Sequence, residues 1–317
     1  MNINLIISGY CSLDHIIRTQ EKPAFGKTSM IINDNFMENY YGGCSVNVAY
    51  HLAKLDLNVS PIIRVGKDYE FSGFKTYLED VGINMQAVDI VPDSLTSSTY
   101  IIEDPNHNHI TLFYEGAMAK KFLKPYKNSW FNHADCALMT VSSLEDNKEF
   151  LKKVKKYNIP LFLGMKMDSN AFPKKVLKEF LNEVKVFFVN KNEALCISEI
   201  YDLKDIRHIF KILPKLETII ITNGQNGSKA IYKGNDSLEE ISIGIIQSTN
   251  VVDTVGAGDA YIAGYIYGYL TGMDIKTSMK YGATLSSFII EAPGCTSNSP
   301  TKEKLMKRYL NHFSKEN

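Results

Sequence analysis

Residues 250–264 read Asn-Val-Val-Asp-Thr-Val-Gly-Ala-Gly-Asp-Ala-Tyr-Ile-Ala-Gly, and they run from a strand-like region through a glycine turn into a helix rich in small residues. The turn Gly256-Ala257-Gly258 would aim unpaired N–H groups and the positive end of a helix dipole at one point. We expect phosphate oxygens to bind there. Asp259 stands at the same helix start, where a carboxylate can take the proton from an attacking hydroxyl group.

Other interpretations of such glycine-rich sequence are also open. In one of them, Asp253 or Asp259 caps the helix and the glycines only allow close packing. Two nucleotide motifs are excluded. The segment lacks the third glycine of the dinucleotide fingerprint and lies late in the chain. Phe25-Gly-Lys-Thr imitates the end of a Walker A loop, but Glu21 stands where that loop needs its first glycine.

Short β-branched runs alternate with amphipathic stretches along the chain. The runs are residues 4–9, 61–65, 136–141, 161–165, 186–190 and 218–222. Helical spacing of apolar residues lies between them, as in Leu52 with Leu55 and Ile206 with Ile209, and a last helical stripe spans residues 302–313. This alternation predicts a three-layer α/β/α fold with a mostly parallel central sheet, built by residues 1–317 as a single domain.

Two regions, residues 10–40 and 96–116, depart from this alternation. In the second region, strand-like sequence begins at Ser98 and again at His109, on either side of the turn-rich residues 104–108. We therefore expect these regions to form a small separate β-sheet. His107 and His109 stand near the turn without a carboxylate or thiolate cluster, so a solvated hairpin tip is expected there instead of a metal site.

Composition narrows the classes of partner. The 317 residues are 44% hydrophobic and 22% charged with a net charge of +0, and no basic stripe favours nucleic acid or an anionic membrane. The five cysteines show no zinc spacing and are interpreted as buried small hydrophobic residues. Without a secretory leader or an apolar run of membrane-spanning length, we expect a cytoplasmic protein that binds small molecules.

A second segment, Tyr41-Gly-Gly-Cys-Ser-Val-Asn-Val-Ala-Tyr-His-Leu-Ala-Lys-Leu, pairs with residues 253–259 to resemble the two signatures of the ribokinase/PfkB carbohydrate kinase family. The resemblance covers nearly the whole chain. Residues 9–14 are similar to the first strand and substrate-binding aspartate of the family, and residues 65–68 to its VGxD element. Residues 190–193 resemble the NxxE motif, and residues 222–227 the strand and turn near the nucleotide.

The resemblance implies a role for each matching residue. Asp259 would be the base, and Gly256, Ala257 and Gly258 the anion hole. The substrate cradle would comprise Asp14, Gly42, Gly43 and Asn47. ATP would be bound by Thr222, Gly224, Gly227, Asn190 and Asn298, and Glu193 would hold Mg2+ through water. The small sheet would be a lid that shields ATP from water, and it could pair two copies as a homodimer.

Several of these residues have simpler alternatives. Asn190 could cap the following helix, Asn47 could bond locally, Asp14 could close a turn, and residues 42–43 could only permit a bend. A monovalent cation as a further cofactor is left open.

The acceptor is expected to be the 5'-hydroxymethyl group of a nucleoside, because residues 114–119 and 294–305 resemble the adenosine-kinase-like branch. Two alternatives remain: a kinase of a free or phosphorylated sugar, and a noncatalytic ligand-binding relative. The chain departs from its relatives at residues 164–168, Gly-Met-Lys-Met-Asp, where many carry an Asp-Pro-Asn-like element. Lys166 could supply a positive charge for a phosphate there.

Overall fold

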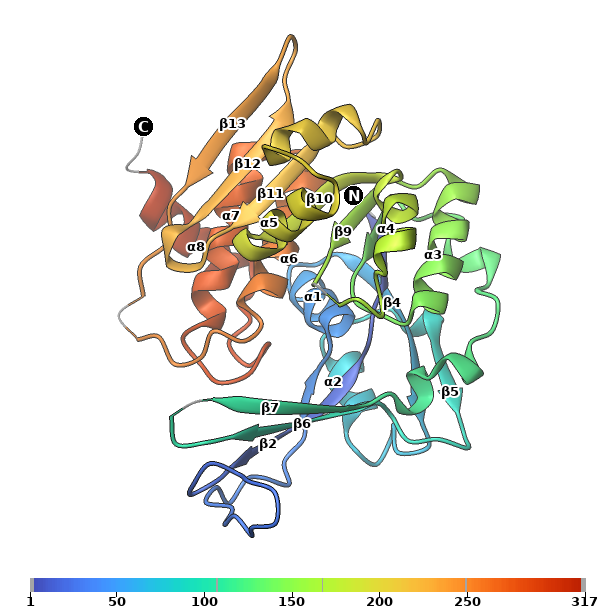
Figure 1. The fold of residues 1–317 in the computed structure, drawn as a ribbon, viewed down its shortest axis with the longest axis vertical. Helices are drawn as coiled ribbons and strands as arrows, with labels where there is room; N and C mark the ends of the chain where they lie inside the picture. The colour runs from blue at the N-terminus through green and yellow to red at the C-terminus, as the bar shows by residue number, and fades with distance from the viewer. Residues whose placement is uncertain (1–2, 107, 167, 249, 315–317) are drawn as a thin grey trace.

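A computed structural model describes residues 3–106, 108–166, 168–248 and 250–314, so His107 lies outside the described residues. Its main feature is a nine-stranded sheet, drawn in Figure 1. In spatial order the strands are β13 (Leu238–Ile243), β12 (Ser228–Lys233), β11 (Thr218–Thr222), β10 (Val184–Asn190), β9 (Leu161–Gly164), β8 (Cys136–Met139), β1 (Asn4–Ser8), β4 (Asn58–Gly66) and β5 (Val88–Val91).

The sheet is parallel from β11 to β5, and only β12 and β13 add antiparallel strands at one edge. The helices are α1 (Cys44–Ala53), α2 (Phe74–Asp80), α3 (Leu144–Tyr157), α4 (Lys174–Leu181), α5 (Lys191–Ile200), α6 (Ala257–Leu270), α7 (Ile275–Ile289) and α8 (Lys302–Phe313). Short 3-10 turns are η1 (Met85–Ala87), η2 (Gly116–Met118), η3 (Lys120–Phe122), η4 (Asn128–Trp130), η5 (Ile206–Lys211) and η6 (Gly224–Asn226).

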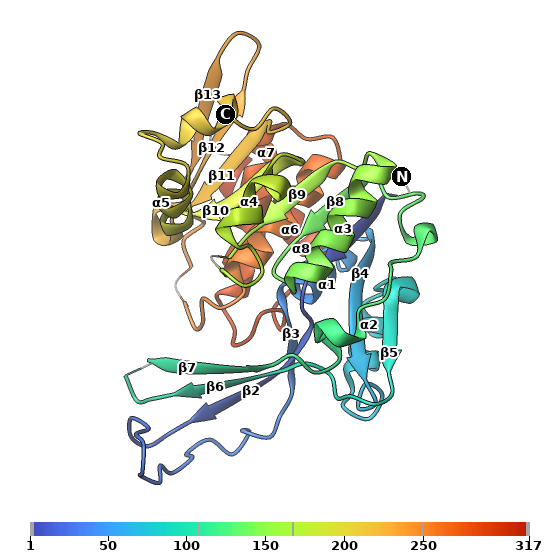
Figure 2. The same ribbon diagram turned by 45° about the vertical axis from the view of Figure 1, so that its right-hand side comes forward.

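Alternation along the strands divides the core into two layers. In β1, Leu5 and Ile7 face a cluster built with α1, α6, α7 and α8, whereas Ile6 faces a cluster built with α3, α4 and α5. Successive side chains of a strand point to opposite faces, so a sheet buried on both faces needs apolar residues at every position. Figure 2 shows the helices on the two sides of the sheet, and the predicted three-layer α/β/α fold is confirmed.

A smaller sheet of four strands stands away from the main sheet (Figures 1 and 2). Its order is β3 (Tyr40–Gly42), β2 (Ser12–Arg18), β6 (Ser98–Glu103) and β7 (His109–Tyr114). The predicted separate sheet is therefore present. Residues 10–40 were expected to belong to this sheet. Between the end of β2 and the start of β3, however, the described residues form no strand.

One predicted helix differs from expectation. Residues around Ile206 form the 3-10 turn η5 instead of an α-helix. The Asp205 side chain caps its start, and Leu213 precedes Pro214, which disfavours helical backbone at the residue before it. In the described part of the chain, no helix is long and apolar enough to cross a membrane.

A buried ion pair fastens the chain just beyond β7 to the main domain. Arg64 of β4 makes two contacts with the Asp146 carboxylate of α3, at 2.6 and 3.0 Å. It also donates to the carbonyls of Ala117 and Met118 at 3.0 and 2.7 Å. Tyr126 donates to the same carboxylate at 2.7 Å, so the buried charges are paired and hydrogen-bonded.

Replacing Arg64 by Met should lower the free energy of unfolding by about 3–5 kcal/mol, because Asp146 would be left as an uncompensated buried charge. Urea unfolding followed by circular dichroism measures this loss. As a control, Lys124→Met removes only an exposed ion pair with Asp89, at 3.4 Å, and should leave the unfolding midpoint nearly unchanged. Equal, small losses in the two variants would contradict the structural role of Arg64.

Candidate active site

The candidate site lies at the carboxyl ends of the parallel strands, the edge where open α/β sheets bind their ligands. Strand register places the end of β10 beside the end of β11, with Asn190 opposite Thr222. Helix α6 begins near this edge, since the last residue of β9, Gly164, faces Ile262 of that helix. A Cβ atom on Gly164 would lie 2.8 Å from the Ile262 Cδ1 atom.

The start of α6 is open to an anion. Gly256 is the N-cap residue with φ of 81°, and no side chain caps the helix within the described residues. The N–H of Ala257 donates to the Thr254 carbonyl at 3.3 Å, whereas no acceptor is found in the described chain for the N–H groups of Gly258 and Asp259. These free donors and the helix dipole favour a negative ligand, and the binding of phosphate there stays a prediction.

The capping interpretation of this segment does not hold for Asp253. Its carboxylate accepts from the Val255 N–H at 2.9 Å and from the Gly294 N–H at 3.2 Å, so it ties the turn to the loop before α8. Close packing is real at Gly256, where a Cβ atom would lie 2.8 Å from the Cα atom of Cys295. The glycine therefore serves both the tight turn and the contact with Cys295.

Asp259 and Asn47 come together across the two predicted signatures. The Asn47 Nδ2 atom of α1 donates to the Asp259 Oδ2 atom of α6 at 2.8 Å, although the residues are 212 positions apart. Asp259 is 8% exposed and Asn47 is 4% exposed. The Asn47 Oδ1 atom is buried and has no hydrogen-bond partner in the described chain. A buried acceptor without a partner is costly, so this atom is suited to a ligand hydroxyl group.

Asp14 joins this group from the smaller sheet through the two glycines. Strand pairing sets Ser12 of β2 opposite Gly42 of β3. A Cβ atom on Gly42 would lie 2.7 Å from the Asp14 carboxylate and 3.6 Å from the Asn47 Oδ1 atom. Gly43 has φ of 93°, and a Cβ there would lie 2.2 Å from the Tyr10 carbonyl oxygen. The four predicted cradle residues are thus neighbours, and the backbone contact and positive φ at Gly43 require a glycine there.

Burial raises the pKa of the Asp14 carboxyl above its ordinary value, and hydrogen bonds with Ser12 and Thr99 counteract part of this rise. A carboxylate that is buried despite the free-energy cost of desolvation is a strong hydrogen-bond acceptor for a ligand that enters the cleft. The role of Asp14 in binding a substrate stays a prediction.

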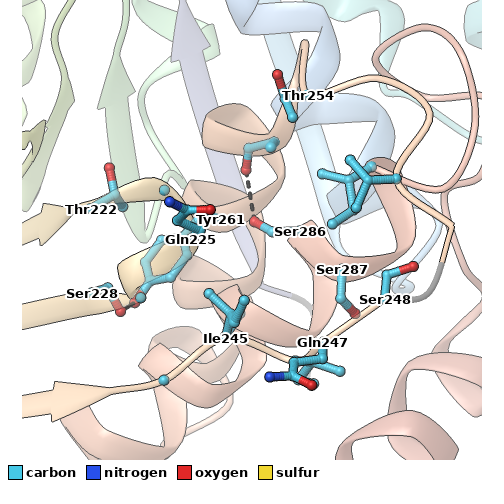
Figure 3. Close-up of a pocket in the computed structure, with 18 of the residues that line it drawn as sticks. Thr222, Gln225, Ser228, Ile245, Gln247, Ser248, Thr254, Tyr261, Ser286 and Ser287 are labelled. Carbon is cyan, nitrogen blue, oxygen red and sulfur yellow. Dashed lines mark hydrogen bonds between the residues drawn. The ribbon is translucent and has the colours of Figure 1, made fainter.

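A cavity of about 580 Å³ adjoins the start of α6 (Figure 3). Thr222, Gly224 and Gly227 line it together with Ala257 and Gly258. In Figure 3, Thr222 and Gln225 stand on one side and Ser286 and Ser287 of α7 on the other. The walls are mostly apolar, through Ile245, Ile246, Val251 and Ile290. A cavity of this size, with mostly apolar walls and several hydroxyl and amide groups, suits the flat base of a nucleotide.

The remaining predicted residues lie outside this lining. Asn190 and Glu193 form a reciprocal capping box at the start of α5, with bonds of 2.9 and 2.7 Å. Asn190 therefore does cap the following helix, and its ATP-binding role stays a prediction. The Asn298 amide donates to the Phe288 carbonyl at 2.6 Å.

The described residues contain no group of three or more His, Cys, Asp or Glu side chains that could hold a metal ion. Mg²⁺ keeps several waters and is often bound by one or two carboxylates plus substrate phosphates. The buried Glu193 fits that water-mediated mode, so the residues fit the ion only as a partner of a bound nucleotide.

Sequence reasoning did not find the apolar cavity walls. Ile245 and Ile246 follow β13, Ser286 lies in the last turn of α7, and Ile290 directly follows that helix. A signal for the first pair was the apolar run Ile243-Gly-Ile-Ile246 just before the glycine motif. No local signal marks Ser286, whose hydroxyl donates to the Ala257 carbonyl at 2.7 Å.

Sequence and structure comparisons with known proteins find similarity over almost the whole chain. Residues 3–302 match the family described as pfkB family carbohydrate kinase. A nucleoside kinase of Methanocaldococcus jannaschii is 30% identical over 304 residues, 96% of this chain and 96% of that protein. The crystal structure of an M. jannaschii nucleoside kinase, an archaeal member of the ribokinase family, has a TM-score of 0.86 at 28% identity and covers 98% of this chain and 99% of its own. Arabidopsis thaliana ribokinase complexed with ribose and ATP shares the fold, with a TM-score of 0.84 at 20% identity over 98% of this chain and 99% of its own.

Replacing Asn47 by Asp should reduce stability at neutral pH, because two carboxylates would face each other where a 2.8 Å hydrogen bond now joins Asn47 and Asp259. We expect a loss of about 1–3 kcal/mol at pH 8. One carboxyl pKa would rise, so the loss should shrink as the pH falls towards 5. Urea unfolding at both pH values measures this, with the exposed Asn235→Asp as control. A loss that does not change with pH would contradict the expected repulsion.

Proposed function

The chain belongs to the pfkB family of carbohydrate kinases, and from this we propose that it transfers the γ-phosphoryl group of ATP to the 5'-hydroxymethyl group of a nucleoside. The observation that carries the proposal is the buried Asn47–Asp259 pair beside the uncapped start of α6. It sets a carboxylate beside an anion site, and this is the arrangement that phosphoryl transfer to a hydroxyl requires.

The nucleoside is favoured over a free sugar by similarity over the full length. The M. jannaschii nucleoside kinase is 30% identical across 96% of this chain, whereas the ribokinase with ribose and ATP is 20% identical, which supports only the shared fold. Phosphorylation of a free or phosphorylated sugar remains the second candidate. Lys166 supports that candidate, because a cation in the cleft could bind the phosphate of such an acceptor.

In the proposed reaction, Asp14 and the free Asn47 Oδ1 atom accept hydrogen bonds from hydroxyl groups of the acceptor and fix its orientation. The hydroxymethyl oxygen attacks the γ-phosphorus while its proton passes to the Asp259 carboxylate. The bond from this phosphorus to the β–γ bridging oxygen breaks, and ADP leaves with the electron pair. The N–H groups of Gly258 and Asp259 stabilise the negative charge on the phosphoryl oxygens.

Donor ATP would place its base between the walls of the 580 Å³ cavity and its phosphates towards the Gly256–Gly258 turn. Thr222, Gly224 and Gly227 would contact the nucleotide, and Asn190 and Asn298 would support this wall. Mg²⁺, when bound, neutralises phosphate charge and orients the triphosphate, and Glu193 would hold it through a bound water.

The smaller sheet would act as a lid, because it carries Asp14 and stands across the cleft from the start of α6. Its outer strand β7 is exposed along its length, and Ile110, Leu112 and Tyr114 share one face. An exposed apolar edge strand invites pairing, so a homodimer through the lid belongs to the proposal. A monomeric mass in sedimentation equilibrium would contradict the homodimer.

The five described cysteines are free thiols, which supports a cytoplasmic location.

The function is tested by ATP consumption with magnesium against adenosine, inosine, guanosine, cytidine, ribose, fructose and fructose phosphates, with products identified by mass. Turnover of a nucleoside to its 5'-monophosphate supports the proposal. Turnover of sugars only would move the assignment to the second candidate. Binding of nucleosides without turnover of any acceptor would instead favour a noncatalytic relative.

Replacing Asp259 by Asn should reduce kcat by about a hundredfold or more, the scale expected when a general base is lost. The amide keeps the shape of the side chain, so the melting temperature should change little. Steady-state kinetics on the best acceptor measures the effect, and the exposed Asp236→Asn is the matched control. Turnover near that of the unmodified protein would refute the role of Asp259.

Replacing Glu193 by Gln should raise the magnesium concentration needed for half-maximal rate about tenfold, because a neutral amide holds a magnesium-bound water less well. Glutamine can still accept the hydrogen bond of the capping box, so α5 should stay intact. Glu199→Gln, on the exposed face of the same helix, is the control. If the two variants have the same magnesium dependence, Glu193 takes no part in binding the ion.

A further inference from the structure

Lys166 is a charged residue that has no role in the proposed transfer to a nucleoside, although it could bind the phosphate of a phosphorylated sugar. It lies two residues beyond β9, whose last residue packs against Ile262, one turn along α6 from Asp259. Its carbonyl accepts from the Asp168 N–H at 2.6 Å. The Asp168 carboxylate in turn accepts from the N–H groups of Asn170 and Ala171. Lys166 therefore follows a strand end that packs against α6, one turn from Asp259.

The lysine ammonium interacts with residues from four separate segments. One of these residues is Cys44, at the start of α1. It also interacts electrostatically with Asp259, with Cys295 and with Asp14 of the smaller sheet. Cys295 packs directly against Gly256. The ammonium thus interacts with residues of the proposed acceptor cradle and with residues beside the proposed anion hole.

The charge of Lys166 is available to a ligand. Within the described residues it forms no ion pair with a carboxylate at 4 Å or less, and its side chain is exposed to solvent. Asp14 and Asp259 would together repel an incoming triphosphate, and one cation between them offsets part of that repulsion. The nearby Cys44 sulfur and Asp259 carboxylate raise the pKa of Lys166 above its ordinary value, so the group stays protonated at neutral pH.

We propose that the Lys166 ammonium binds the γ-phosphoryl group of ATP during transfer, on the side opposite the N–H groups of the α6 start. This rests on the proposed kinase function. The acceptor oxygen forms its bond to phosphorus as the bond to the bridging oxygen of ADP breaks, and Asp259 receives the hydroxyl proton. Lys166 keeps its own protons and donates hydrogen bonds to the nonbridging oxygens, whose charge must be balanced throughout transfer.

A solvated surface lysine is the simpler explanation, and the position argues against it. A lysine that served only solubility would not need to approach Cys44, Asp259 and Asp14. The unusual sequence at residues 164–168 fits the proposal as well. A lysine there supplies a mobile point charge that can follow the phosphoryl group between donor and acceptor.

The test compares Lys166→Met and Lys166→Arg with Lys175→Met, an exposed lysine of α4. Lys166→Met should lower kcat about a hundredfold, the scale of losing one transition-state donor, with both KM values within about threefold. Lys166→Arg should recover at least about a tenth of the rate, since it keeps the charge. Lys175→Met should behave as the unmodified protein.

A binding measurement separates a phosphoryl contact from a structural effect. ADP with aluminium fluoride and magnesium imitates the phosphoryl group in transit. Its affinity, measured by calorimetric titration, should fall about a hundredfold in Lys166→Met. The affinity for ADP alone should be the same in Lys166→Met and in the unmodified protein. Equal loss of both affinities would show a general disturbance of the site and would overturn the proposal.

Three kinetic results decide the rest. Normal kcat in Lys166→Met beside an inactive Asp259→Asn would remove Lys166 from the reaction and leave the kinase function intact. A rise in KM confined to phosphorylated sugars would make Lys166 part of the acceptor subsite and overturn the proposal. If the unmodified protein turns over no acceptor, the kinase function fails, and the aluminium fluoride titration still decides whether Lys166 contacts the phosphoryl mimic.

Discussion

One buried hydrogen bond, from the Asn47 amide to the Asp259 carboxylate, joins the two halves of the cleft. α1 and α6 pack on the same face of the main sheet, and this polar contact lies between them within an apolar cluster. A buried carboxylate must find donors, and Asn47 supplies one from a helix that begins directly after Gly43. The pair therefore sets how the acceptor side and the donor side of the cleft face each other.

Close backbone contacts hold this arrangement in place. Gly42 lets the Asp14 carboxylate approach β3, Gly43 lets the chain turn past the Tyr10 carbonyl, and Gly256 lets α6 begin against Cys295. At Gly43 and Gly256 the positive φ adds a second reason, since residues with a Cβ atom adopt it at a cost. The Arg64–Asp146 network then anchors the end of β7 to the main domain, so the smaller sheet is attached through buried charge as well as backbone pairing.

Local sequence patterns predicted much of this structure. The six strands expected from β-branched runs are all present in the main sheet, with ends that shift by three residues or fewer. Strands β5, β12 and β13 were not expected. In the edge strand β13, charged residues such as Glu239 and Glu240 hide the alternation. The predicted helix at residue 206 became a 3-10 turn, since Pro214 limits the backbone before it.

The sequence by itself determined the fold class, the glycine turn at the start of α6 and the pairing of two signatures, because these depend on periodicity and on residues with special backbone freedom. Only the tertiary structure decided which atoms meet. The Asn47–Asp259 contact spans 212 positions, cavity walls come from α7 and from the segment after β13, and Lys166 follows the end of β9. No local pattern encodes such contacts, since they arise when parallel strands bring their carboxyl ends to one edge of the sheet.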